Sequence, residues 1–227
     1  MTMQKRIVAS QRVAAPVAGF PVAVRAGHLL FISGRVGLDA QSGFPLRGYG
    51  ELGRKPVPAL GLLAPDSWEE AFVAQAARMY EDLNVLLEEN GASRSDLLFY
   101  SIYARAMRNF PVIVRTRAAL FAGGVAPPST ASQVPGLLYP DALVYFDPVA
   151  MIPDPSRDLG KQVLSSRHVV QGPLSNYELA TRAGHHTFYA GVVGAHPQTG
   201  VIVRGAGELN DAAWPRPAGR CAGPIRA

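Results

Sequence analysis

Histidine side chains are the first candidates for chemistry, because an imidazole can bind a metal ion or move a proton. The chain has five histidines. His185 and His186 are adjacent, so on a strand their side chains would point to opposite faces. His168 and His196 have no acidic residue at a ligand-like spacing, and no metal-binding motif is present in the sequence. We therefore expect no metal site and no other cofactor.

Nucleophiles and phosphate-binding loops are equally weak candidates. Cys221 lies in a segment rich in proline and glycine, and Ser33 has no obvious base in the sequence. Gly48 and Gly50 are not followed by the helix start that a phosphate-binding loop requires. A ribonuclease would need a positioned His pair or Lys–His set, and the sequence indicates neither. The sequence therefore does not identify a catalytic residue.

Four arginines lie close together in the sequence: Arg105, Arg108, Arg115 and Arg117. With a formal net charge of +5, they raise the possibility of a nucleic-acid surface. No run of adjacent basic residues with interleaved aromatics supports that function. The pattern favours a solvated basic rim, so a nucleic-acid partner is not expected.

Composition indicates a well-packed globular protein. Of the 227 residues, 48% are hydrophobic and 17% are charged. The apolar runs are too short to span a bilayer, and no apolar signal core follows the first charged residues. Because a single cysteine excludes an internal disulfide framework, we expect a cytoplasmic protein without a membrane partner.

A segment near the start of the chain is repeated later. Residues 25–52 align without a gap with residues 182–209, an offset of 157, and about half of the aligned residues are identical. His28 and His185 are matching turn residues of the two copies, which favours a structural role for both. Self-similarity at a fixed offset indicates a duplicated structural unit.

The first unit reads as an α+β domain. The expected elements are strands at 7–16, 20–25 and 29–33, a helix from about 67 to 90, a strand at 96–104, a helix from 109 to about 123, and strands at 131–134 and 142–149. Two amphipathic helices of this kind need a sheet face to cover, which predicts a two-layer domain. Residues 44–65 lack a period and predict a long surface loop, either functional or a tolerated insertion.

Helix boundaries carry recognisable signals. Ser67 and Glu70 form a potential capping box, and Gly91 can take the left-handed conformation that ends a helix. Asn109 is expected to cap the second helix, with Pro111 in its first turn. The buried face of the first helix is predicted to contain Phe72, Ala76, Met79, Leu83, Leu86 and Leu87.

The second unit has the opening strands but no helices. We expect a complete domain at 1–153, a linker at 154–162 and a partial repeat at 163–227. A lone hairpin is marginally stable in water. The partial repeat is therefore expected either to pack on the first unit or a neighbouring chain, or to be poorly ordered.

Several segments of the first unit resemble one family in their order and spacing. They are residues 24–34, 38–43, 86–93, 107–110, 127–131 and 142–147. In these segments the chain resembles the Rid family, the YjgF-like reactive-intermediate deaminases, also called endoribonuclease L-PSP-like proteins. The resemblance implies a chorismate-mutase-like α+β fold and a homotrimer with ligand pockets between subunits. It also implies hydrolysis of enamines and imines such as 2-aminoacrylate.

The resemblance also assigns ligand-binding positions, and most of them are altered. The arginine that holds the substrate carboxylate in deaminating members falls on Ser129, followed by Thr130. The family's pocket tyrosine falls on Phe20, and its helix asparagine falls on Val114. Without the arginine, a carboxylate ligand would lose its main counter-ion.

The remaining pocket positions lie on strands. The glutamate that positions the attacking water falls on Tyr145, with Asp147 on the same strand face, while Ser33 and Gly34 are retained. In the second copy, Tyr177 restores the tyrosine. Two functions remain open: hydrolysis of an imine, enamine or related small molecule with an altered site, or ligand binding and assembly without catalysis.

Overall fold

The computed structural model describes residues 5–13, 15–16, 19–54, 69–121, 126–157, 159–165, 177–194 and 202. The chain divides into two compact units. The first contains Met1–Ser165 and Leu174–Gly191, and the second contains Ser166–Pro173 and Val192–Ala227. All the helices and strands named below belong to the first unit.

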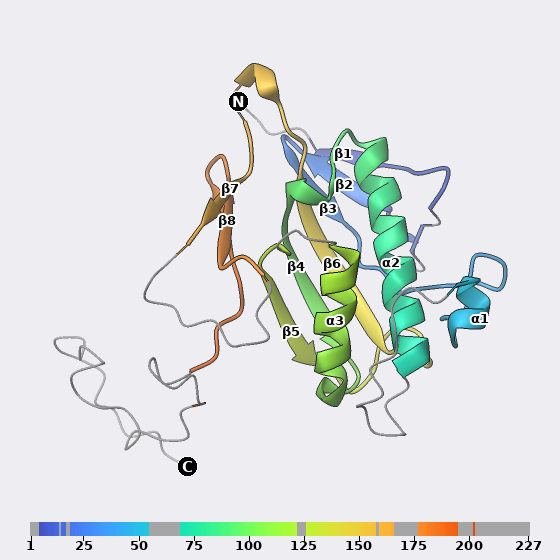
Figure 1. Ribbon diagram of the computed structural model, residues 1–227. Helices are drawn as coiled ribbons and strands as arrows, with labels where there is room; N and C mark the ends of the chain where they lie inside the picture. Colours follow the sequence, from blue (N-terminus) through green and yellow to red (C-terminus); the bar gives the residue numbers. More distant parts are fainter. Residues whose placement is uncertain are drawn as a thin grey trace, which may run out of the picture. The chain divides into compact units, whose positions relative to one another are not determined.

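A six-stranded sheet forms the centre of the first unit (Figure 1). Its strands, in spatial order, are β1 (Lys5–Val8), β2 (Ala23–Ala26), β3 (Leu29–Ile32), β6 (Val144–Met151), β4 (Leu97–Ala104) and β5 (Ser129–Gln133). Neighbouring strands are antiparallel except β4 and β5, which are parallel. This order makes β5 an edge strand of the sheet.

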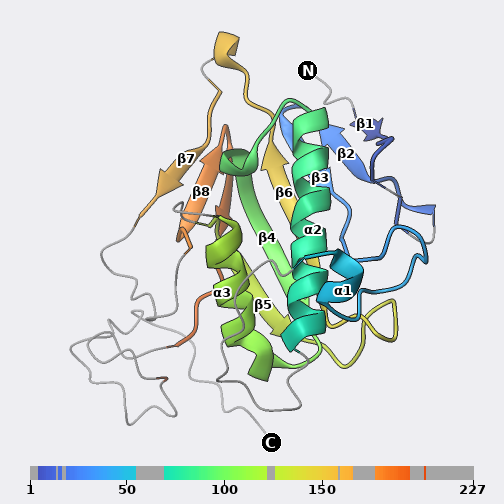
Figure 2. The ribbon, with the colours of Figure 1, turned by 45° about the vertical axis from the view of Figure 1, so that its right-hand side comes forward.

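Two helices cover one face of this sheet (Figure 2). They are α2 (Glu69–Glu89) and α3 (Phe110–Leu120); a short helix, α1 (Tyr49–Leu52), packs beside α2. Every apolar residue predicted for the buried face of the first helix is indeed buried. The α2 helix ends at Glu89, and Gly91, two residues later, has a φ of 73°, the left-handed conformation expected there. The predicted two-layer α+β fold is confirmed.

Details at the element ends differ from the expectations. The first strand ends at Val8 rather than reaching 16, and α1 lies inside the region expected to be a loop. Asn109 precedes α3 as predicted, with Pro111 in the first turn, but its side chain makes no capping hydrogen bond. The reason is local, because residues Met107–Asn109 form a 3-10 turn that leads into the helix. Ser67 lies outside the described residues.

A second, three-stranded sheet contains the repeated segment. Its strands are β7 (Gln162–Leu164), β8 (Ala180–Ala183) and β9 (His186–Tyr189). In β2–β3, Ala23 pairs with Ile32; in β8–β9, Ala180 pairs with Tyr189, so both copies have the same register at an offset of 157. Gly27 and Gly184 occupy the matching turns with φ of 62° and 57°.

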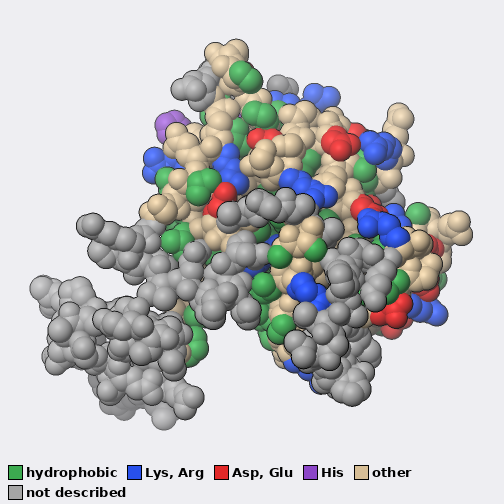
Figure 3. All heavy atoms as spheres, viewed as in Figure 1, with side chains coloured by type: hydrophobic (Ala, Val, Ile, Leu, Met, Phe, Trp, Pro, Cys, Tyr) green, Lys and Arg blue, Asp and Glu red, His purple; other side chains and the backbone are tan. Residues whose placement is uncertain are grey.

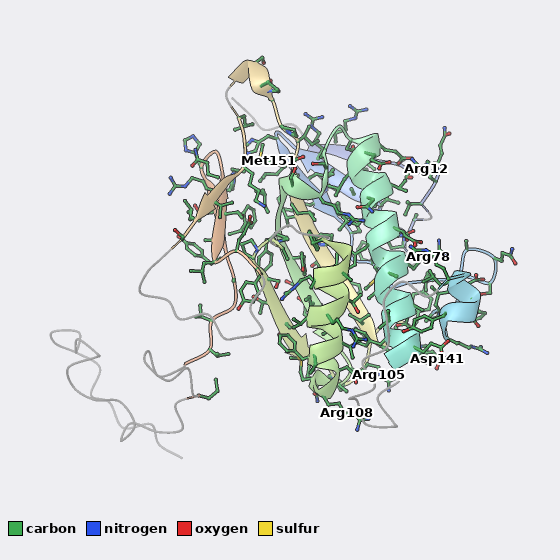
Figure 4. The ribbon with its side chains drawn as sticks, in the orientation of Figure 1. Arg12, Arg78, Arg105, Arg108, Asp141 and Met151 are labelled. Carbon is green, nitrogen blue, oxygen red and sulfur yellow. The ribbon has the colours of Figure 1, made fainter. Side chains whose placement is uncertain are left out.

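The β8–β9 hairpin packs on the sheet face opposite the helices. Ala183 is fully buried in an apolar cluster with Leu29, Leu98 and Met151. Figure 4 labels Met151 beside this second sheet. The described strands β8 and β9 therefore pack on the six-stranded sheet, while residues 166–176, 195–201 and 203–227 of the expected partial repeat lie outside the described residues. No helix within the described ranges is both long and apolar enough to span a bilayer.

Candidate functional site

Side chains alternate between the two faces of the central strands. Tyr100 of β4 lies in the core under the helices. Ser101 and Tyr103 therefore face the other side, which carries no helix. Across the sheet, Ser101 pairs with Asp147 of β6 and with Thr130 of β5.

Directly opposite residues share one face of a sheet, with Cβ atoms typically about 5 Å apart. Thr130, Ser101 and Asp147 therefore form one row, and the Tyr103–Tyr145 pair forms the next. We call these five residues the open-face cluster.

Tyr145 is positioned by a glycine of the first copy. A Cβ atom added to Gly34 would lie 1.6 Å from the Tyr145 hydroxyl oxygen, so only glycine leaves room for this side chain. The Tyr145 ring is tilted against Tyr103, with their centroids 5.7 Å apart. The structure thus brings Gly34 and Tyr145 together, as two of the predicted ligand-binding positions.

Asp147 is the acid of the open-face cluster. Its side chain reaches solvent, yet partial burial raises the pKa of its carboxyl group above the ordinary value. Burial also raises the pKa of Tyr145, with smaller contributions from the charge of Asp147 and from Tyr103. A carboxyl group with a raised pKa is more readily protonated near neutral pH, which suits a general acid or base.

The other predicted positions do not all join this cluster. Ser33 donates its hydroxyl hydrogen to the carbonyl oxygen of Pro21 at 2.6 Å, which gives this side chain a structural bond. Phe20 is 61% exposed. Val114 is half-buried on α3, in the helix layer on the opposite face of the sheet. Within one chain, Val114 and the open-face cluster lie on different faces of the sheet; the pocket that the resemblance predicts lies between subunits and stays a prediction.

Ser129 is also on the helix side. It pairs with Tyr100, is 7% exposed, and accepts a hydrogen bond from Arg117 Nη1 at 3.1 Å. Strand alternation therefore sends Ser129 inward in this chain, on the face opposite Tyr145, and its place in a pocket between subunits stays a prediction. Thr130, one residue later, is the residue that faces the open side.

The sequence did not predict that Arg117 would be buried. The sequence favoured a solvated basic rim, but Arg117 is only 1% exposed. Its guanidinium carbon lies 5.2 Å from the centroid of the Tyr177 ring. Arg117 therefore contacts both Ser129 of β5 and Tyr177, which precedes β8. A sequence signal existed, because Arg117 is one helical turn after Ile113 and shares its buried face.

The other members of the arginine group lie differently. Figure 4 labels Arg105 and Arg108 near one end of α3, and Arg105 donates a hydrogen bond to the carbonyl oxygen of Pro140. On the face drawn in Figure 3, basic and acidic side chains are interspersed rather than gathered by sign. This distribution gives no support to a nucleic-acid surface on that face.

His28 and His186 have structural contacts. The ring of His28 lies 5.9 Å from that of His186, and His28 Nε2 lies 3.3 Å from the carbonyl oxygen of Ala183. Within the described ranges, no group of three His, Cys, Asp or Glu side chains is arranged to hold a metal ion.

Known proteins resemble about two thirds of the chain. No protein-family model matches it. A RutC family protein of Pyrococcus abyssi is 21% identical over 148 residues, which cover 65% of this chain and 98% of the relative. A solved Pseudomonas aeruginosa structure of unknown function is 27% identical, covers 66% of this chain and 94% of its own, and superposes with a TM-score of 0.50.

A Yersinia pestis structure carries the family name. It is described as a protein of unknown function of the conserved Rid protein family. It is 16% identical, covers 65% of this chain and 99% of its own, and has a TM-score of 0.50. At that identity the match shows the fold alone. Together with the sequence relative, it confirms the resemblance on which the predicted fold was based.

Proposed function

For a chain that is Rid-like in sequence and fold, we propose hydrolysis of a small imine or enamine at the open-face cluster. The observation that carries the proposal is Asp147, a carboxyl group with a raised pKa beside Tyr145 on the helix-free face. Asp147 is the one carboxyl group among the five side chains of the cluster, and its pairing with Ser101 of β4 holds it in a fixed register.

The proposed reaction uses Asp147 as the base and then as the acid. Its carboxylate accepts a proton from water while the water oxygen bonds to the imine carbon, and the C=N double bond becomes single. The nitrogen takes a proton from solvent to give a carbinolamine. Asp147 then donates its proton to this nitrogen, the hydroxyl proton passes to the carboxylate as the C–N bond breaks, and ammonia and a carbonyl compound leave. Asp147 finally releases its proton to solvent, which balances the one that the nitrogen took.

The composition of the cluster favours a substrate class. It contains one carboxyl group, two phenols and two aliphatic hydroxyls, and none of its members is a cation. A ligand carboxylate would lie near the negative charge of Asp147, which costs free energy at close range. A neutral imine, or its protonated cationic form, fits better. The proposed substrate therefore lacks a carboxylate, unlike 2-aminoacrylate.

An activity assay tests this proposal. The full chain is mixed with a carboxylate-free imine and, separately, with 2-aminoacrylate, each generated in situ, and ammonia release is followed. We expect faster release from the carboxylate-free imine, and a loss of at least tenfold in kcat/KM for Asp147→Asn. Glu88→Gln, an exposed carboxyl on α2, is the matched control.

Two results would overturn the proposal. Faster turnover of 2-aminoacrylate would contradict the substrate class, and an unchanged kcat/KM for Asp147→Asn would contradict the role of Asp147. Binding of a small molecule without turnover of either imine would favour the second candidate function, a ligand-binding protein that has lost catalysis. The altered positions Ser129 and Val114 are the observation behind that candidate.

The organisation of the chain is part of the same proposal. We infer a complete Rid-like domain at 1–153, a linker at 154–162 and a partial repeat at 163–227, supported by the matched register of the two hairpins. A cytoplasmic location and a homotrimer are the assignments that the resemblance and composition favour. Such a trimer can form only when the surfaces of this chain that would contact the other subunits are accessible.

A further inference from the structure

The start of the outer edge of β5 is bonded by residues that flank the second copy of the hairpin. The backbone N–H of Glu178 donates to the carbonyl oxygen of Ala126 at 2.8 Å. The N–H of Gly191 donates to the carbonyl oxygen of Ser129 at 3.1 Å, and Tyr177 forms a parallel bridge with Ala126. An edge strand presents unpaired backbone groups that another chain can bind. Here residues of the same chain take these positions.

Side chains add to this attachment. Thr181 Oγ1 donates to the carbonyl oxygen of Leu98 at 2.6 Å, and both groups are buried. The ring of Phe188 stacks on that of Phe99 with a centroid distance of 6.4 Å. Together with the burial of Ala183, these contacts tie β8 and β9 to the face of β4.

The first copy presents only the base of its hairpin, at Phe20, to solvent. At the offset of 157, Phe20 corresponds to Tyr177, Pro21 to Glu178 and Gly34 to Gly191. Phe20 is 61% exposed, whereas its counterpart Tyr177 is partly buried against Arg117. One chain therefore carries two hairpins of one shape and a single β5 edge.

We propose that the β8–β9 hairpin is an intramolecular occupant of the β5 edge, which keeps the β2–β3 hairpin of a second copy of this chain from binding there. The matched register supports this competition, because the two hairpins have the same internal strand pairing. The intramolecular hairpin has two advantages. It is tethered, which gives it a high effective concentration. In addition, Pro21 has no N–H to replace the bond that Glu178 donates.

Release of the hairpin is then a condition for self-association through β5. This inference does not depend on the proposed hydrolysis, since it concerns assembly and is measured as mass. It also sets the condition under which the homotrimer expected from the resemblance can form.

The test compares closed and released forms of the full chain by light scattering after gel filtration. Ala183→Asp places a carboxylate in the apolar cluster under the hairpin and should release it. The matched control is Ala26→Asp, the corresponding position of the first copy, which is half-buried. We expect the wild type and the control to stay monomeric, and Ala183→Asp to gain mass as concentration rises. Adding Phe20→Ala should reverse that gain.

A reversible lock provides a second arm. In a Cys221→Ser background, Ala126→Cys with Tyr177→Cys places two cysteines across the β-bridge. We expect the oxidised form to remain monomeric at every concentration and the reduced form to associate. A trimer that persists in the oxidised form would overturn the proposal. So would an Ala183→Asp chain that stays monomeric while hydrogen exchange shows its hairpin released.

Discussion

The two hairpins of this chain share a turn and a register, but they lie in different surroundings. The β2–β3 hairpin is part of the six-stranded sheet and packs under α2, so Ala23, Leu30 and Ile32 are in the main core. The β8–β9 hairpin is followed by no helix in the part of the chain that the structure describes, and it packs on β4 and at the start of the β5 edge. Similar sequence thus gives the same local structure, while the residues that differ determine what each hairpin contacts.

The matched glycines make this difference concrete. Gly34 lies against Tyr145, and its counterpart Gly191 lies against Thr130. Both contacted side chains belong to the open-face cluster, so the two copies approach the candidate site from two strands of one sheet. Substitutions at matched positions can therefore test the comparison directly.

The largest effect is expected at Gly37 and its counterpart Gly194. A Cβ atom on Gly37 would lie 2.1 Å from the carbonyl oxygen of Gln75 in α2, whereas a Cβ atom on Gly194 would meet no atom of the described residues within 4 Å. Helix backbone cannot yield, so Gly37→Ala should lower the free energy of unfolding by about 3 kcal/mol. Gly194→Ala should change it little. Urea denaturation measures both, and equal effects would contradict the different packing of the two copies.

A smaller effect is expected from exchanging Thr181 with its counterpart Val24. Thr181→Val leaves the buried carbonyl oxygen of Leu98 without its side-chain donor, which should cost the hairpin attachment about 1–3 kcal/mol. Val24 is half-buried, so Val24→Thr should be nearly neutral. Hydrogen exchange of β8 and β9 amides reports the attachment. Unchanged protection in Thr181→Val would show that the Leu98 bond does not hold the hairpin.

The smallest expected effect is electrostatic. It concerns Asp147, a member of the open-face cluster, on the side of the site that Gly34 contacts. Because the pKa of Asp147 is raised in the folded state, its stabilising contribution is present below pH 3.8 and is lost as the pH rises through the raised value. Asp39 has a lowered pKa, owing mainly to its hydrogen bond from the Ser42 backbone, so its contribution is lost as the pH falls. The pH dependence of the Asp39 contribution to stability is therefore opposite in sign to that of Asp147.

Thermal unfolding of Asp147→Asn and Asp39→Asn across pH 3–7 tests these signs. Relative to wild type, Asp147→Asn should become more stable as the pH rises, and Asp39→Asn less stable. Two curves with the same slope would show that the environments of the two carboxyl groups were misjudged.

Sequence periodicity was sufficient to predict the helices and turns, but not which residues of other elements they contact. The helix face around Met79 and Leu83 and the turns at Gly27 and Gly184 follow from local rules, and all are confirmed. The inward direction of Ser129 depends on the register between β4 and β5, which the sequence does not specify. One residue of register separates a ligand-facing from a core-facing side chain.

Burial of Arg117 could be inferred in part, because its helical spacing from Ile113 puts it on the covered face. Its partner Tyr177 lies 60 positions later, across segments outside the described residues. No local pattern joins two residues so far apart. The same reason explains why the sequence left several outcomes open for the second hairpin.

Amide hydrogen exchange of Glu178 and Gly191 tests most directly whether the second hairpin occupies the β5 edge. Their N–H groups donate to the carbonyl oxygens of Ala126 and Ser129, at the start of the β5 edge. The N–H of Ala190 instead donates to the carbonyl oxygen of Leu179, next to the second hairpin itself. The attached hairpin predicts slow exchange at all three amides. Fast exchange at Glu178 and Gly191 with slow exchange at Ala190 would contradict it, because the hairpin would then be folded but not attached to the edge.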